Sequence, residues 1–112
     1  MKSPEISVII ATSNSAEYIG ECMDSVLGRA TDRIELIVVD VNSTDKTKEI
    51  VSKTAEAEDR VVFLSDTGGS LGRAKNIGLD HARAPYILFL EPEGILYADA
   101  LSFLCQKFRD NP

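Results

Sequence analysis

The chain has 112 residues, of which 44% are apolar and 27% charged, a balance typical of one soluble globular domain and not of a disordered chain. Its formal net charge is −6, and acids and bases are interspersed without a basic stripe. This pattern argues against nucleic acid or an anionic membrane surface as a partner. No segment has the apolar length of a membrane span, and the N-terminus lacks the pattern of a signal peptide.

The first predicted elements are a strand and a helix. Residues 6–10 form a short β-rich run, and residues 11–15 follow as a polar turn. Apolar residues then recur at helical spacing as far as Leu27, and Gly28 is the expected end of that helix. Cys22 lies on the apolar face of this helix, and neither it nor Cys105 has a CxxC partner, which favours reduced core thiols and a cytoplasmic location.

The second predicted strand is the most informative feature. Four aliphatic residues at 36–39 end abruptly on Asp40, and a polar cluster at 42–45 follows at once. A continuous apolar run suits a strand buried on both faces, as in parallel sheets, and the polar cluster is typical of a turn that caps a helix over 46–54. In open α/β sheets ligands bind outside the carboxyl ends of the strands, so Asp40 stands where a site is expected. The alternative is that Asp40 only caps the element that follows.

The second half of the chain continues the alternation. It contains a strand, a glycine-rich loop, a helix, a strand and a last helix, predicted at residues 61–64, 66–72, 73–82, 86–90 and 99–108. The fourth strand also ends on an acid, Glu91. This order predicts right-handed crossovers and a parallel sheet with helices on both faces, which would place Asp40 and Glu91 on the same edge of the sheet.

Several segments together are similar to the family 2 glycosyltransferases of the GT-A fold. The strand ISVII, a polar turn with Asn14, the helix ECMDSVLGR and the pair IELIVVD and NSTDKT resemble the opening of that family. The later segment GRAKNIGLDHARAPYILFLEPEG resembles its Ala-Arg-Asn-x-Gly helix, its Gly-x-Tyr-Ile strand and its acidic metal-binding motif. The match runs from about residue 6 to residue 104, nearly the whole chain.

The resemblance implies an α/β fold, a three-layer α/β/α sandwich with a mostly parallel sheet like that of nucleotide-diphospho-sugar transferases. Residues 1–112 would form a single donor-binding domain, and the acceptor-binding half of the family, which usually supplies the catalytic base, would be absent from this chain. On its own the chain is therefore expected to bind donor weakly and to have little or no transferase activity.

The same resemblance implies a set of site residues. Those expected to bind the nucleotide-sugar are Ala11, Thr12, Ser13, Asn14, Asp40, Asn42, Lys75 and Glu91. Glu91 and Glu93 occupy the places of the acids that hold a divalent metal, Mn²⁺ or Mg²⁺, against the diphosphate of the donor. Read without the resemblance, the two glutamates are an ordinary solvated turn and Lys75 is a surface lysine.

The chain departs from the family pattern at the nucleotide end. Val41 replaces the acid that reads the edge of the uracil ring, and valine cannot accept a hydrogen bond, although the neighbouring Asn42 can. Both metal acids are glutamates separated by a proline, each one methylene longer than the usual aspartate.

Three functions are compared on these grounds. The first is a glycosyltransferase that moves a sugar from a UDP-sugar to a hydroxyl of a glycan or a lipid-linked acceptor. The second is a non-catalytic, degenerate module of the same fold for binding or assembly, suggested by Val41 and the two glutamates. The third, an unrelated receiver-type domain, is disfavoured because residues 10–13 lack an acid pair. The exposed edge of the fourth strand also predicts a homodimer.

Overall fold

In the computed structural model, which describes residues 3–28, 33–94, 106–107 and 110, the four strands form one parallel sheet. In chain order its strands are β1 (Ile6–Thr12), β2 (Ile34–Val41), β3 (Val61–Asp66) and β4 (Tyr86–Phe89). They lie side by side in the order β3-β2-β1-β4, so β1 and β2 are the central strands. The parallel α/β fold expected from the alternating pattern is confirmed.

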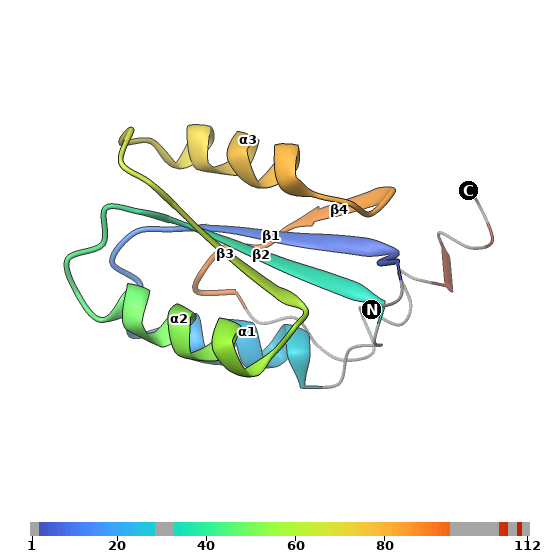
Figure 1. The fold of residues 1–112 in the computed structure, drawn as a ribbon, viewed down its shortest axis with the longest axis horizontal. Coiled ribbons are helices and arrows are strands. Elements are labelled where there is room, and N and C mark those ends of the chain that lie inside the picture. The colour runs from blue at the N-terminus through green and yellow to red at the C-terminus, as the bar shows by residue number, and fades with distance from the viewer. Residues whose placement is uncertain (1–2, 29–32, 95–105, 108–109, 111–112) are drawn as a thin grey trace.

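Three helices complete a three-layer sandwich: α1 (Ile19–Leu27), α2 (Thr47–Ala57) and α3 (Leu71–His81). Helices α1 and α2 cover one face of the sheet and α3 covers the other (Figure 1). None of the helices in the described residues is long and apolar enough to cross a membrane.

The burial of the central strands explains their unbroken apolar sequences. Every residue of β1 and β2 is buried, and successive side chains point to opposite faces. Val8 and Ile10 pack with α1 and α2, whereas Ile9 and Ala11 pack in the cluster that contains Ala74 of α3. Both faces of the sheet are therefore core. Polar side chains gather at the amino edge, where the strands begin, and at the carboxyl edge, where they end.

Several element boundaries differ from those predicted. The first strand continues to Thr12, because Ala11 and Thr12 stay in register with β2 and do not begin the polar turn. Helix α3 begins at Leu71 and not at residue 73, because the Ser70 side chain accepts the N–H of Arg73 and caps the helix two residues earlier. The predicted last helix, 99–108, lies outside the described residues apart from 106 and 107.

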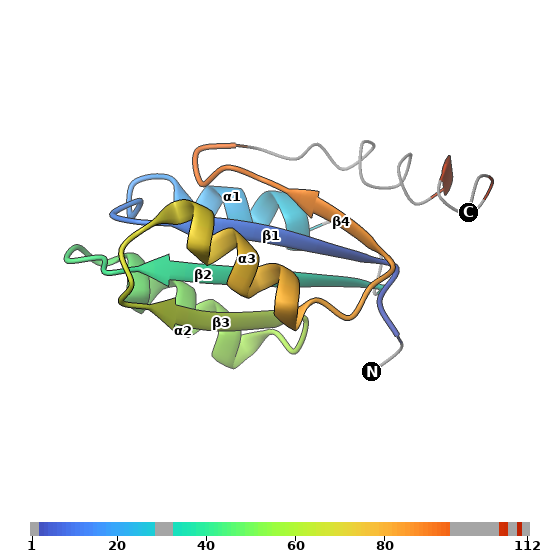
Figure 2. The same cartoon turned by 90° about the horizontal axis from the view of Figure 1, so that it is seen from above.

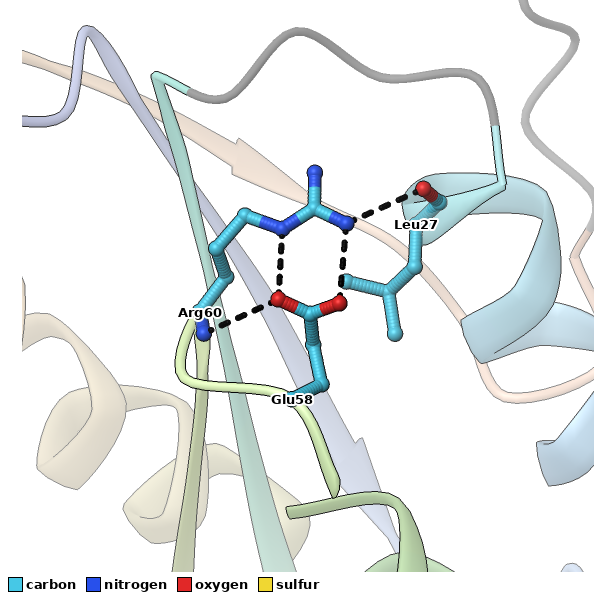
Figure 3. Close-up of polar contacts among 3 residues, drawn as sticks. All are labelled: Leu27, Glu58 and Arg60. Carbon is cyan, nitrogen blue, oxygen red and sulfur yellow. Dashed lines mark hydrogen bonds and ion pairs between the residues drawn. The ribbon is translucent and has the colours of Figure 1, made fainter. Parts of the chain in front are cut away.

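Polar contacts tie together the amino edge of the sheet, where the strands begin. Arg60, just before β3, binds Glu58 through both Nε (2.8 Å) and Nη2 (3.1 Å). The same Nη2 donates to the carbonyl of Leu27 at the end of α1 (3.1 Å), so one guanidinium joins α1 to the turn that leads into β3 (Figure 3). These contacts are among residues of the protein itself, and the candidate site is at the opposite edge.

Candidate functional site

The order of the strands reverses between β1 and β4. From β1 the chain moves outward through β2 and β3, then crosses back over the sheet through α3 to return on the other side of β1 as β4 (Figure 2). The last residue of β4, Phe89, pairs with Ile9, and β1 continues for three residues beyond that point. In parallel α/β sheets a ligand crevice forms at such a reversal, outside the carboxyl ends of the strands.

The loops that follow β1 and β2 are joined by hydrogen bonds. Asn14 Oδ1 accepts the N–H of Thr44 (2.7 Å), and the N–H of Asn14 donates to Ser43 Oγ (2.8 Å). Ser13 Oγ donates to the carbonyl of Val41 (2.7 Å). Asn14 also has a positive φ of 50°, which asparagine tolerates better than most residues. Two of the predicted site residues, Ser13 and Asn14, thus hold the two strand-end loops in one hydrogen-bonded unit and remain exposed.

The two other residues predicted in the first loop are buried strand residues. Ala11 lies on the α3 face of the sheet, in the same apolar cluster as Val41. Thr12 is fully buried, and within the described residues its Oγ1 atom has no hydrogen-bond partner. A ligand at this edge can therefore meet the side chains of Ser13 and Asn14 directly, whereas Thr12 lies beneath the surface.

Asp40 is fully buried and supports the turn that it opens. Its Oδ2 accepts the N–H of Ser43 (3.1 Å), and its Oδ1 accepts the Ser43 hydroxyl. The next polar residue, Asn42, is exposed, has a φ of 48° and donates from Nδ2 to the carbonyl of Thr67 (3.2 Å). The carboxylate of Asp40 thus fixes the shape of the loop, and Asn42 links that loop to the end of β3.

Lys75 and Glu91, both expected at the site through the family resemblance, form an ion pair. Lys75 Nζ, on α3, lies 3.3 Å from Glu91 Oε1, just after β4. The side chains are 40% and 59% exposed, and an exposed pair of this kind contributes about 1 kcal/mol at most. The pair therefore matters for where it places a cation and a carboxylate, at the strand reversal and accessible to a ligand.

The backbone of Glu91 is held from the other side of the sheet by Cys22. The Cys22 thiol, on α1, donates to the carbonyl of Glu91 (3.4 Å). Burial, and to a smaller extent the negative charge of Glu93, together raise the pKa of this thiol to about 11. The thiol is protonated at neutral pH and therefore acts as a donor and not as a nucleophile. The apolar setting of Cys22 in the sequence indicated a core thiol and gave no sign of this contact.

The metal ligands expected at Glu91 and Glu93 are two exposed carboxylates on either side of the buried Pro92. Within the described residues, no group of three or more histidine, cysteine or acidic side chains is placed to hold a metal ion. Mg²⁺ is commonly bound by one or two carboxylates together with substrate phosphates and waters. These residues therefore fit a metal that is bound together with a diphosphate, and they do not build a metal site from protein groups alone.

A second ion pair at this edge was not expected from the sequence. Asp66, the last residue of β3, is 8% exposed, and its Oδ2 lies 3.2 Å from Nε of Arg73 in the first turn of α3. Its other oxygen, Oδ1, accepts the N–H of Gly68 (3.0 Å). The signal available in the sequence was an acid at the end of a third strand, which had been assigned to the glycine-rich loop.

A separate hollow of about 510 Å³ lies between α1 and α2, away from these groups. Its lining consists of Asp24, Leu27, Gly28, Lys53, Thr54, Ala57 and Glu58. It is near the C-terminal ends of the two helices, and therefore near the amino edge of the sheet. It contains none of the predicted site residues.

Comparison with known proteins identifies the family of this chain. A family model described as Glycosyl transferase family 2 matches residues 7–112. An uncharacterized glycosyltransferase of Haemophilus influenzae is 35% identical over 102 residues, which cover 90% of this chain and 41% of that protein. Staphylococcus aureus TarS 1-349 in complex with UDP-GlcNAc superposes with a TM-score of 0.86 at 26% identity, covering 95% of this chain and 31% of that one.

A second solved structure is similar over the same region. The mannosyltransferase PcManGT from Pyrobaculum calidifontis, in complex with GDP-Man and Mn²⁺, has a TM-score of 0.78 at 26% identity. The match covers 97% of this chain and 32% of that one. The chain thus spans less than half the length of each of these three proteins.

Proposed function

Because the chain belongs to glycosyl transferase family 2, we propose that it binds a nucleotide-sugar donor at the carboxyl edge of its GT-A sheet, for transfer of the sugar to an acceptor hydroxyl. The observation that carries the proposal is the meeting of Lys75 and Glu91 at the strand reversal, beside the joined loops after β1 and β2. A UDP-sugar is the proposed donor, supported by the likeness to a structure that holds UDP-GlcNAc. The acceptor is proposed to be a hydroxyl of a glycan or of a lipid-linked sugar.

In this proposal, different residues at the carboxyl edge bind different parts of the donor. Ser13, Asn14 and Asn42 line the nucleoside end, and Asp40 keeps their loop in shape from below. The Lys75 ammonium offers a point charge to the diphosphate. No residue of the chain is assigned as the base that deprotonates the acceptor.

Glu91 and Glu93 are the residues that would hold a divalent metal, Mn²⁺ or Mg²⁺. When bound, such an ion neutralises the charge that develops on the leaving diphosphate. The likeness to a mannosyltransferase solved with GDP-Man and Mn²⁺ supports this part of the proposal. Binding of the metal would require Glu91 to share its carboxylate between the ion and Lys75, which lies 3.3 Å away.

The test is thermal unfolding of the chain with UDP and Mn²⁺ together, with each alone, and with the Glu91→Ala, Glu93→Ala double variant. A ligand that binds only the folded state at a hundred times its Kd stabilises it by about 2.7 kcal/mol, a shift in Tm of about 10 °C in a domain of this size. We expect a rise in Tm only when UDP and Mn²⁺ are both present, and its loss in the double variant. Both glutamates are exposed, so the variant is expected to fold normally.

The second candidate is a non-catalytic domain of the same fold. The apolar Val41 at the nucleotide edge, and the presence of glutamates at both positions of the metal acids, favour it. It predicts that Tm stays constant under every combination of UDP and Mn²⁺, with the double variant indistinguishable from the parent chain. The same thermal experiment therefore decides between the two functions.

A cytoplasmic location is part of the proposal. Its support is the buried Cys22, a free thiol held protonated in the core, as is usual in a reducing compartment.

A further inference from the structure

Helix α3 places its two cations toward opposite sides of the sheet. The helix lies over the central strands β1 and β2, with Ala74 packed against them (Figure 2). Arg73 and Lys75, the residues on either side of Ala74, therefore project in opposite directions across the sheet. Arg73 meets Asp66 at the end of β3, and Lys75 meets Glu91 after β4.

Between the two ion pairs, the face of the sheet beneath α3 is apolar. Ala11 and Val41, at the ends of β1 and β2, lie in the same cluster on this face and are 4% and 5% exposed. Val41 pairs in register with Asp66 on the neighbouring strand, so the Asp66 carboxylate lies beside a side chain that has no polar atom. A ligand that bridges the strand ends thus meets a cation and an acid at each end.

The two oxygens of the Asp66 carboxylate differ in their hydrogen bonds. Oδ1 is occupied by the N–H of Gly68 (3.0 Å). Oδ2 is buried and, within the described part of the chain, accepts no hydrogen bond; its contact with Arg73 Nε is an ion pair. The ion pair compensates the charge of this oxygen but leaves it without a hydrogen bond, and a ligand N–H would supply one.

Arg73 can supply the matching donor. Its side chain is 64% exposed, so the guanidinium can turn from the carboxylate toward a ligand carbonyl. It lies directly over Gly68, where a Cβ would be 2.8 Å from Nε, so glycine makes room for it there. A carboxylate that accepts beside a guanidinium that donates is complementary to a ring N–H flanked by a carbonyl, the edge that uracil presents.

We infer that Asp66 and Arg73 read the base of the bound nucleotide, with Asp66 Oδ2 accepting the uracil ring N–H and the Arg73 guanidinium donating to a flanking carbonyl. The inference rests on the proposed donor site and adds a residue pair that determines base specificity. The base then lies over the end of β3, and the diphosphate lies toward Lys75 and Glu91.

The decisive experiment is titration calorimetry of the chain with UDP and with CDP, each in the presence of Mn²⁺, for the parent and for Asp66→Asn. UDP and CDP differ only at the base edge in question. Because the Gly68 N–H keeps Oδ1 of an asparagine in place, its Nδ2 replaces Oδ2 and presents a donor. We expect the parent to bind UDP about tenfold more tightly than CDP, the size of one hydrogen bond to a charged group. In Asp66→Asn we expect that preference to vanish or to reverse, since the N3 atom of cytosine is an acceptor.

Two further variants provide a second test and a control. Arg73→Met removes the guanidinium from an exposed side chain and is expected to lower the affinity for UDP without unfolding the chain, which decides the matter if Asp66→Asn folds poorly. Asp59→Asn, an exposed aspartate near the other end of β3, is the matched control and is expected to leave both affinities unchanged.

Titration with inorganic pyrophosphate and Mn²⁺ separates the two levels of the proposal. If UDP binds but is not preferred over CDP, or if Asp66→Asn binds UDP as the parent does, the base-reading role is overturned and the donor site stands. If neither UDP nor pyrophosphate binds the parent chain, the donor site itself is overturned, and the base-reading role with it.

Discussion

Glu35 is a buried carboxylate within the core strand β2, and it holds the segment that leads into β4. Its Oε2 accepts the hydroxyl of Ser7 (2.7 Å) and the N–H of Arg83 (3.0 Å), and Arg83 Nε lies 2.9 Å from Oε1. The N–H of Ala84 in turn donates to the Ser7 hydroxyl (3.2 Å). This network sets where β4 starts, and through β4 it sets the position of Glu91 at the other edge of the sheet.

The Glu35 network should make the free energy of unfolding depend on pH in the acid range. Burial by itself raises the pKa of Glu35, but the hydrogen bonds from Arg83 and Ser7 outweigh it and hold the pKa below the ordinary value. A carboxyl with a lowered folded-state pKa stabilises the fold above its unfolded-state pKa of about 4.3, and this stabilisation is lost as the pH falls through the folded-state value. Stability should therefore decline below about pH 4.3.

Glu35→Gln is the corresponding variant. We expect it to lower the free energy of unfolding at pH 7 by about 2 kcal/mol, since a charged acceptor of several hydrogen bonds becomes neutral, and to flatten the decline at acid pH. Urea unfolding at a series of pH values measures both effects. Glu49→Gln, which removes an exposed i,i+4 pair with Lys53, is the control and should change stability by less than about 0.5 kcal/mol. Equal effects of the two variants would contradict this account.

At the residue level the sequence predicted the identity of some site groups but not their partners. Lys75 and Glu91 were expected at one site through a family resemblance, and the structure brings them together. Asp66 and Glu35 were missed because only the fold brings their charged partners, Arg73 and Arg83, to them. The partner of Glu35 lies 48 residues away in the chain, a distance over which propensity and periodicity carry no information.

At the level of elements, the close packing of α3 on β1 depends on Gly78. A Cβ added there would lie 2.7 Å from Cγ2 of Ile9, a fully buried core side chain, and 3.5 Å from Cγ2 of Val39. Gly72, near the start of the same helix, has nothing within 4 Å of such a Cβ. The two glycines therefore form a matched pair in one helix: a Cβ at Gly78 would meet the core, whereas a Cβ at Gly72 would meet open space.

Gly78→Ala and Gly72→Ala should shift stability in opposite directions. Alanine in a helix is favoured over glycine by about 0.5–1 kcal/mol, and at Gly72 nothing opposes this gain. At Gly78 overpacking of the core costs about 1–3 kcal/mol, so we expect net destabilisation. Thermal unfolding of both variants measures the difference. A Gly78→Ala chain as stable as Gly72→Ala would show that α3 can move off the sheet without loss.

The elements themselves were predictable because their signals are local. Continuous aliphatic runs predicted both central strands, and helical spacing predicted α1 and α3. The boundaries were less well predicted: β1 was ended two residues early because Ala11 and Thr12 resemble a turn until the register with β2 is known. Likewise α3 was begun two residues late, because glycines obscure the Ser70 cap.

At the scale of the whole molecule, the fold class followed from the order of elements, since alternating strands and helices allow few arrangements other than a parallel sheet. The position of β4 beside β1 did not follow from that order. It decides the site, because it creates the reversal at which Lys75 and Glu91 meet.

In the part of the chain that the structure describes, β4 is an outer strand of the sheet. Within the described residues β4 pairs only with β1, and its last residue, Phe89, is 46% exposed. An unpaired parallel edge with an exposed aromatic side chain can pair with another edge. A symmetric dimer would bring the two β4 edges together in antiparallel orientation, because a two-fold axis reverses one strand relative to the other.

We therefore predict self-association of the chain through the β4 edge, weakened by Phe89→Lys, because a charged side chain on an edge strand opposes pairing. Leu79→Lys is the matched control: Leu79 is 45% exposed, but it lies on α3, away from the edge. Light scattering over a range of concentrations should show a dimer for the parent and for Leu79→Lys, and a shift toward monomer for Phe89→Lys. A monomeric parent at high concentration would refute the dimer. Equal losses in both variants would mean that general surface hydrophobicity, and not the strand edge, drives association.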